Sequence, residues 1–279
     1  MALSMGGASR QRPFLKWAGN KYRIMERILP RLPQGRRLIE PFAGSCAVFL
    51  STSYRLNVLN DANADLINLY TVLQDEGHAF IDALQGYFTP RYNNETTYYR
   101  LRKQFNTTDD PWLKAALFVY LNRHGYNGLC RYNAGGGFNV PFGRYKRPYY
   151  PVRELREFHT RSKQARFTNE SFLDAMKKAR RGDVVYCDPP YVPLSRTASF
   201  TAYSAGGFGE AEQTALAEQA MRLAARGVTV VISNHDTPFT REVYQTADCE
   251  RFPVRRSISC NGAQRGMAAE ILALFSASA

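Results

Sequence analysis

The chain has 279 residues, of which 44% are hydrophobic, and a formal net charge of +13. It has no run of 18 apolar residues, which excludes a membrane-spanning helix, and its polar, glycine-rich start does not fit a secretion signal. The five cysteines are odd in number and form no C-x-x-C pair, so we expect free thiols in a reducing cytoplasm. The four histidines are far apart in the sequence, which argues against a dedicated metal site.

The first motif is FLKWAGNK, residues 14–21, and it precedes a helical pattern from Tyr22 to Leu29 that Pro30 ends. An exposed loop with a tryptophan and two lysines can grip an aromatic, charged small molecule. Trp17 can equally cover the edge of the core, and taken by itself the loop favours this simpler interpretation.

A strand, a small-residue turn and a helix come next. Residues 37–40 predict the strand, and Gly44 in the following turn allows a strained backbone and the close approach of a ligand. No Lys-Ser/Thr pair follows this glycine, so the turn is not a phosphate-binding P-loop. It is not a G-x-S-x-G nucleophile elbow either, and we do not expect Ser45 to act as a nucleophile.

A second predicted strand, residues 55–60, ends in Asp61. In α/β folds an acid at the tip of the second strand binds ribose hydroxyls, and the spacing from the first turn favours that role here. Asp61 can also cap the helix predicted from Ala62 to Leu73. The two roles are compatible.

Residues 79–126 have a mostly helical pattern, with Pro111 in a first turn. The chain then enters a segment, residues 126–146, that mixes Gly, Asn, Arg and Tyr in a way that no core requires. We predict a β-hairpin whose side chains reach outward to base edges, where Arg can pair with guanine and Asn with adenine. A plain loop of turn residues is the alternative.

The same region is one-sided in charge. From Pro111 to Arg153 there is no Asp or Glu, and the cations in it are Lys114, Arg123, Arg131, Arg144, Lys146, Arg147 and Arg153. A solvated surface normally mixes both signs, so this stretch predicts a polyanionic partner.

The strand around which the chain is organised is Val184–Cys187, which is apolar and followed by Asp188, Pro189, Pro190 and Tyr191. The prolines must end the strand, which leaves carbonyl groups and the Asp188 carboxylate at a sheet edge beside a flat ring. Acceptors in this setting suit the exocyclic amino group of a planar base. A rigid turn with a packed tyrosine is the simpler alternative.

From about Glu170 helices and strands alternate again. We predict helices at 171–181 and 210–226, strands at 183–187 and 228–233, and an antiparallel pair, 251–259 with 269–275. These α/β parts flank the basic middle of the chain, which therefore looks inserted.

Taken together, the stretches resemble the Dam family of DNA adenine-N6 methyltransferases. The resemblance runs from about residue 12 to 275 in the order of the α class: donor motif, recognition domain, catalytic tetrad. The matching motifs are FLKWAGNK (14–21), EPFAGS (40–45), LNDAN (59–63), LNRHGYNGLCRYN (121–133), FNVPFGRYKRPY (138–149), VVYCDPPY (184–191), FTAY (200–203) and ISNHDT (232–237).

The resemblance implies an α/β fold: a Rossmann-like, S-adenosylmethionine-dependent methyltransferase sheet with an inserted, mostly helical DNA-recognition domain that carries the β-hairpin. Residues 12–62 and 166–279 would form the catalytic domain and 63–165 the recognition domain, after a disordered terminus or cloning remnant at 1–11. The donor, S-adenosyl-L-methionine, would leave as S-adenosyl-L-homocysteine, and no metal would be needed.

The resemblance also implies roles for single residues. The catalytic tetrad would be Asp188, Pro189, Pro190 and Tyr191. The donor would be bound by Trp17, Lys21, Phe42, Asp61 and Asp188. The target would be a flipped adenine within GATC. The DNA would be contacted by Lys16, Tyr126, Asn127, Leu129, Arg131, Asn139, Pro141, Arg144, Tyr145 and Lys146.

Departures from the family pattern are small: Asn20 replaces a common Gly, His124 a common Tyr or Phe, and Ala43 a common Val. The triple glycine at 135–137 makes the hairpin tip flexible, which puts its order in question more than the choice of base. A monomer in the bacterial cytoplasm, acting on double-stranded DNA, is expected. The alternatives are an RNA or protein amino-group methyltransferase and a catalytically silent DNA-binding protein.

Overall fold

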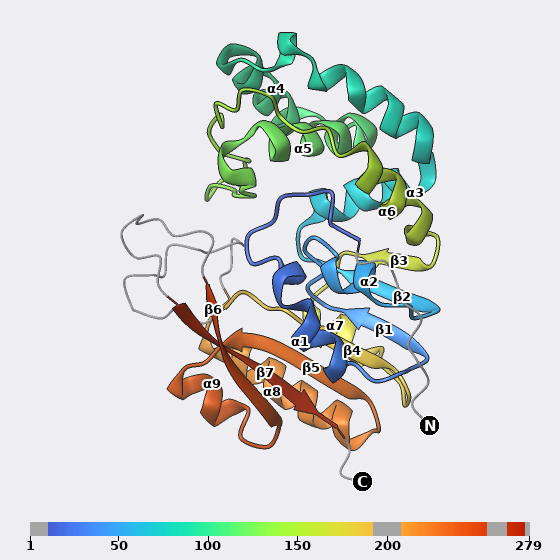
Figure 1. Cartoon of the computed structure of the whole chain (residues 1–279), viewed down its shortest axis with the longest axis vertical. Coiled ribbons are helices and arrows are strands. Elements are labelled where there is room, and N and C mark those ends of the chain that lie inside the picture. Colours follow the sequence, from blue (N-terminus) through green and yellow to red (C-terminus); the bar gives the residue numbers. More distant parts are fainter. Residues whose placement is uncertain (1–10, 192–207, 256–266, 277–279) are drawn as a thin grey trace. The chain divides into compact units, whose positions relative to one another are not determined.

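The computed structural model describes residues 11–191, 208–255 and 267–276, which form two compact units built from alternating parts of the chain (Figure 1). The first unit comprises residues up to 25, 43–53 and 63–169. The second comprises residues 26–42, 54–62 and those from 170 onward.

The second unit holds six strands of a seven-stranded sheet, in the order β2-β1-β4-β5-β7-β6. The first four strands are parallel, and β7 is antiparallel to both of its neighbours, β5 and β6. This arrangement confirms the predicted α/β class. The strands are β1 (Arg37–Glu40), β2 (Leu56–Asn60), β4 (Val184–Cys187), β5 (Thr229–His235), β6 (Asp248–Arg255) and β7 (Met267–Phe275). Residues 256–259 of the predicted antiparallel pair lie outside the described ranges, as does the FTAY motif.

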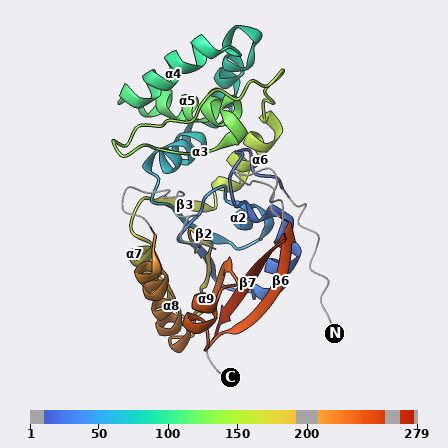
Figure 2. The same cartoon turned by 90° about the vertical axis from the view of Figure 1, so that its left-hand side faces the viewer.

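Helix α8 covers one face of this sheet (Figure 2). Val185 and Cys187 of β4 point to that face, as do Val230 and Ile232 of β5, and all four are buried against Leu216 and its neighbours on the helix. The unit's helices are α7 (Phe172–Lys177), α8 (Glu210–Ala225) and α9 (Pro238–Val243). Alternating side chains on a strand point to opposite faces, so Tyr186 and Asp188 are turned away from α8.

The first unit is mainly helical, as predicted for the middle of the chain. Its elements are α2 (Ala47–Ser51), α3 (Ala64–Leu84), α4 (Glu95–Thr107), α5 (Pro111–His124), α6 (Val152–Ser162) and the short strand β3 (Ala165–Thr168). Helices α3, α4 and α5 begin at side-chain caps, which are Asn63, Asn94 and Asp110. Pro111 occupies the first turn of α5, as predicted.

Short helical turns replace some of the longer predicted helices. The 22–29 region consists of a 3-10 turn, Lys21–Ile24, helix α1 (Met25–Ile28) and a second turn, Leu29–Arg31. Further 3-10 turns are Gln85–Phe88, Pro90–Tyr92 and Tyr126–Gly128. The helix expected from Ala62 starts at Ala64, and its cap is the Asn63 side chain, which accepts the Leu66 N–H; capping is therefore not the role of Asp61.

Thiols and histidines have simple settings in the described part of the chain. Cys46, Cys130, Cys187 and Cys249 are free thiols, as expected. Two histidines that are distant in sequence do meet: the rings of His78 and His159 are 5.6 Å apart. Within the described ranges no helix is long and apolar enough to span a membrane, and no cluster of three or more His, Cys, Asp or Glu is arranged to hold a metal.

Candidate active site and nucleic-acid interface

The carboxyl end of β4 carries the predicted tetrad. In the register of the parallel pair, Tyr186 lies opposite Val231 and Cys187 opposite Ile232, so the next pair is Asp188 beside Ser233. The Ser233 hydroxyl, which is buried, lies 3.0 Å from Asp188 Oδ1 and 3.0 Å from the Tyr186 hydroxyl. Asp188 itself is half-buried, so its carboxylate combines a fixed partner with access to a ligand.

Tyr191 is held at both ends. Its ring meets that of His235 edge to face, with the centroids 4.7 Å apart, and its hydroxyl lies 3.4 Å from Glu270. His235 and Glu270 are register partners on β5 and β7, which explains why both reach the same tyrosine. Burial, with Asp188 and Glu270 nearby, raises the pKa of the Tyr191 phenol well above its ordinary value, so the hydroxyl stays protonated.

A second network fixes the prolines. Gln213 of α8 donates to the Pro190 carbonyl at 2.8 Å, and its own side-chain oxygen accepts from Asn234 at 2.9 Å. Asn234 also donates to the Tyr244 hydroxyl. Gln213, Asn234 and Tyr244 are all buried, so these bonds tie the backbone of the tetrad to the core beneath it.

Besides Asp188, the predicted donor-binding residues of the second unit are Phe42 and Asp61. Asp61 follows β2 directly, and Asn60 before it bonds to the carbonyls of Pro41 and Glu170 at 3.0 Å each. The loops after β1 and before α7 are thereby fixed around the end of β2. Phe42 stacks on Phe172 with the ring centroids 5.3 Å apart, so it has a packing role whether or not it also meets a ligand.

In the first unit, Trp17 and Lys21 lie in one tight turn. The Lys21 ammonium is buried and donates to the Gly19 carbonyl at 2.6 Å. A Cβ on Gly44 would be 2.8 Å from Trp17 Nε1, so the indole lies directly against the glycine backbone, whose φ of +46° also favours glycine. The predicted close approach at Gly44 is thus made by Trp17.

Lys16 is joined to the 126–146 segment by an asparagine that the sequence analysis missed. The buried Asn122 side chain accepts the Lys16 N–H at 2.9 Å and donates to the Lys16 carbonyl at 2.7 Å. It also donates to the Gly128 carbonyl at 3.2 Å. We call this arrangement the Asn122 clamp. A Cβ on Gly128 would be 2.2 Å from Lys16 Cβ, so only glycine fits there.

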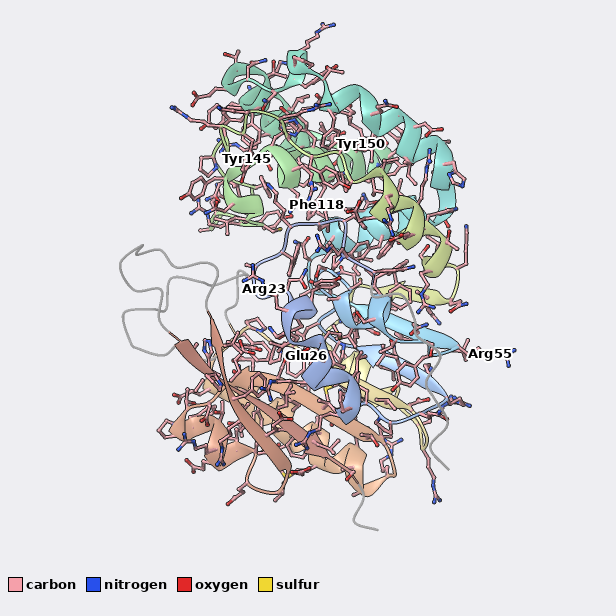
Figure 3. The ribbon with its side chains drawn as sticks, viewed as in Figure 1. Arg23, Glu26, Arg55, Phe118, Tyr145 and Tyr150 are labelled. Atoms are coloured by element: carbon pink, nitrogen blue, oxygen red, sulfur yellow. The ribbon has the colours of Figure 1, made fainter. Side chains whose placement is uncertain are left out.

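The Lys16 side chain is directed by its neighbours. Its ammonium lies 3.9 Å from the centroid of the Tyr145 ring, a cation–π contact. Burial and the positive charge of Arg123 lower the pKa of the Lys16 ammonium to about 8. Tyr145 belongs to the segment that runs back along the first unit toward Tyr150, which bonds to the Ile81 carbonyl (Figure 3).

The two arms of the 126–146 segment pair in antiparallel fashion, as in the predicted hairpin. The pairing consists of isolated bridges at Gly125–Phe142 and Tyr132–Phe138, so the arms are not regular strands. The tip is closed by Asn133, which accepts the Gly137 N–H through its side chain at 2.9 Å.

Side chains at the base of this segment are exposed. Tyr126 is 51% exposed, and Asn127, in the left-handed region at φ +52°, is exposed beside it. The Arg131 guanidinium bonds to Asn139 through both the side-chain oxygen, at 2.8 Å, and the carbonyl, at 3.2 Å. Asn139 therefore orients Arg131, which has further N–H groups to offer.

The remaining predicted DNA contacts are also placed on this segment. Pro141, Arg144 and Lys146 are exposed, and Leu129 is half-buried. Arg144 lies 3.5 Å from Glu95, an exposed ion pair that a phosphate can replace at low cost. The sequence-predicted residues thus fall into a group on the first unit (Lys16, Trp17, Lys21 and residues 126–146) and a group on the second (Phe42, Asp61 and the tetrad).

The acceptors at the end of β4, the acid after β2 and the basic, aromatic-rich segment are the features expected of a nucleic-acid amino-methyltransferase. The comparison with protein families makes this specific. The family model for the D12 class of N6 adenine-specific DNA methyltransferases matches residues 17–258, and the chain belongs to that family.

Curated relatives agree. The DNA adenine methylase of Salmonella typhi is 50% identical over 266 residues, which cover 95% of this chain and 96% of that protein. The DNA adenine methylases of Escherichia coli K12 and Vibrio cholerae are 49% and 48% identical, again over 95% of this chain and 96% of each relative. Among solved structures, precorrin 8W decarboxylase from Methanobacterium thermoautotrophicum aligns over 95% of each chain, with 9% identity and a TM-score of 0.39.

Proposed function

We propose that the protein transfers a methyl group from S-adenosylmethionine to N6 of an adenine flipped out of duplex DNA, at GATC sites. The observation that carries the proposal is the Asp188 carboxylate at the end of β4, followed by Pro189, Pro190 and Tyr191, in a chain of the D12 class. We further propose that the enzyme acts as a monomer in the bacterial cytoplasm, where the DNA of its bacterial relatives lies.

S-adenosylmethionine, when bound, supplies a methyl group activated by a sulfonium charge. The chain has residues that fit such a donor. Asp61, placed at the end of β2 by the bonds of Asn60, can accept from ribose hydroxyls. Trp17 and Lys21, in their fixed turn, offer an aromatic surface and a cation. Phe42 adds an aromatic edge at the end of β1.

The adenine amino nitrogen is a poor nucleophile because its lone pair is delocalised into the ring. The Asp188 carboxylate and the Pro189 carbonyl can each accept one N6–H, which favours a pyramidal nitrogen with its lone pair available for in-line attack. The positive charge that grows on nitrogen is stabilised by the same acceptors. Tyr191 offers a ring for the base to stack on, which offsets part of a flipping cost of a few kcal/mol.

Recognition of the site would be divided along the 126–146 segment. Tyr126, exposed at its base, would enter the stack where the adenine leaves. Arg131, held by Asn139, would pair with a guanine, while Lys16 would reach the outer guanine of the site. The remaining base contacts would be made by Asn127, Leu129 and Pro141. The phosphates of the DNA would be contacted by Arg144 and Lys146, and Tyr145 would also contact the DNA.

The test is methyl transfer from a labelled donor to an unmethylated plasmid, followed by sequencing that locates the modified bases. N6-methyladenine confined to GATC is the expected result. Methylation of adenine in another sequence would retain the chemistry and overturn the base contacts assigned to Lys16, Leu129 and Arg131. Failure to modify DNA, with transfer to RNA or protein instead, would overturn the proposal.

A further inference from the structure

The hydrogen bonds around Asp188 have a direction that the tetrad alone does not explain. An ionised carboxylate has acceptors only, so across the 3.0 Å contact Ser233 must donate to Asp188. With its one hydrogen used, Ser233 can only accept from Tyr186, 3.0 Å away on the same face of the sheet. The bonds therefore run from Tyr186 through Ser233 to Asp188.

Tyr191, at the other end of the tetrad, has a different partner, because its hydroxyl donates to Glu270 at 3.4 Å. A serine hydroxyl has one donor and two lone pairs, so the Ser233 side chain can serve Tyr186 and Asp188 together. The contact of the Ser233 hydroxyl with the Cys187 carbonyl, at 3.4 Å, is longer than its 3.0 Å bonds to Tyr186 and Asp188.

The backbone of Asp188 does not by itself fix the direction of its carboxylate. The prolines after it restrict the backbone, but the terminal torsion of an aspartate is broad, so the carboxylate can turn. Ser233 is fully buried in β5, where it pairs with Leu272 of β7 and directly follows Ile232, the last residue paired with β4. A hydrogen bond from such a residue favours one orientation of the carboxylate.

We propose that Ser233 is a positioning residue for methyl transfer: its hydroxyl, polarised by Tyr186, sets the orientation of the Asp188 carboxylate toward the flipped adenine. The inference rests on the proposed function and adds to it a residue that neither touches the substrate nor belongs to the tetrad. Because a displacement of about 1 Å can cost about a hundredfold in rate, a single hydroxyl suffices for a large effect.

The experiment uses the full chain, a duplex with one target site and S-adenosylmethionine. We expect Ser233→Ala to lower kcat about 10- to 100-fold while the KM values for DNA and donor change less than about twofold, since the effect is on orientation. Ser233→Thr keeps the hydroxyl and should restore kcat to within about threefold of wild type. Tyr186→Phe, which removes only the outer hydroxyl, should lower kcat by a smaller factor.

The matched control is Ser162→Ala, which removes another buried serine hydroxyl. In the first unit this hydroxyl donates to the His159 carbonyl at 2.8 Å. The substitution should leave kcat unchanged. Fluorescence of 2-aminopurine in place of the target adenine, with S-adenosylhomocysteine present, should rise with Ser233→Ala as with wild type, because the base still leaves the stack.

The inference is overturned if folded Ser233→Ala has the kcat of the wild type. It is also overturned if Ser233→Thr does not restore kcat. If the alanine variant does not fold, Tyr186→Phe decides, and an unchanged kcat counts against the proposal. A wild-type enzyme that does not methylate adenine in DNA overturns the proposed function instead, whatever the variants show.

Discussion

Replacing Asn122 with alanine removes three hydrogen bonds at once, two to the backbone of Lys16 and one to the Gly128 carbonyl. Each backbone group left without its partner costs about 1–3 kcal/mol when water cannot reach it. Since the Lys16 backbone is only partly buried, we take the lower end for each bond. The expected loss in the free energy of unfolding is then about 3 kcal/mol.

The functional effect should be selective. With the Asn122 clamp gone, the Lys16 backbone is no longer fixed to the 126–146 segment, and its ammonium loses a defined place over the Tyr145 ring. Discrimination at the outer base pair assigned to Lys16 should fall by about 1–3 kcal/mol. Affinity that comes from phosphate contacts should change little.

Two measurements check this: urea unfolding for stability, and kcat/KM on the cognate duplex against duplexes changed at the outer pair. The matched control is Asn106→Ala. Asn106 makes the same pair of bonds, at 2.8 and 3.1 Å, to the backbone of Phe138, but it is exposed and does not touch Lys16. Outer-pair discrimination that survives in folded Asn122→Ala, or that falls equally with Asn106→Ala, would refute the reasoning.

Three further outcomes are expected. Asp188→Ala should abolish turnover and leave DNA affinity largely intact in a gel-shift titration; normal turnover would remove Asp188 from the chemistry. Arg131→Ala should cost about 1–3 kcal/mol of discrimination at one base pair in competition kinetics, whereas equal weakening on all sequences would make Arg131 a phosphate contact. Burial lowers the pKa of His124 from 6.5 to about 4, so the unfolded chain binds the proton first; about 3 kcal/mol of stability should be lost as pH falls from about 6.5 to 4. His124→Phe should remove that pH dependence. A free energy of unfolding that falls equally with pH in both proteins would contradict the prediction.

Strand β4 could be predicted because it is apolar throughout and is followed by an acid and two prolines. Val184–Cys187 is buried on both faces, which the sequence expresses as a continuous apolar run. The tetrad and Asp61 could be found for the same reason, since they follow the strands directly. Ser233 could not: its role depends on the register between β4 and β5, and only paired strands show which side chains are opposite.

The irregular arms of the 126–146 segment were beyond sequence reasoning for a different reason. Alternating polar and apolar residues favour strands, but Asn127 and Arg144 have positive φ values, which interrupt an extended chain. The backbone groups that a strand partner would use are taken by α4: Arg102 and Tyr98 both bond to the Val140 carbonyl. Tertiary contacts thus replace the hydrogen bonds between paired strands, and no local sequence pattern predicts these contacts.

The alternation of the chain between two units has a consequence for its synthesis. Leu38 in β1 pairs with Val184 in β4, 146 residues later, so the sheet cannot close until the tetrad has left the ribosome. At about 5–20 residues per second, β1 waits roughly 7–30 s with one side unpaired. Every segment of the first unit has emerged by residue 169, so that unit can fold while the second unit is still being synthesised.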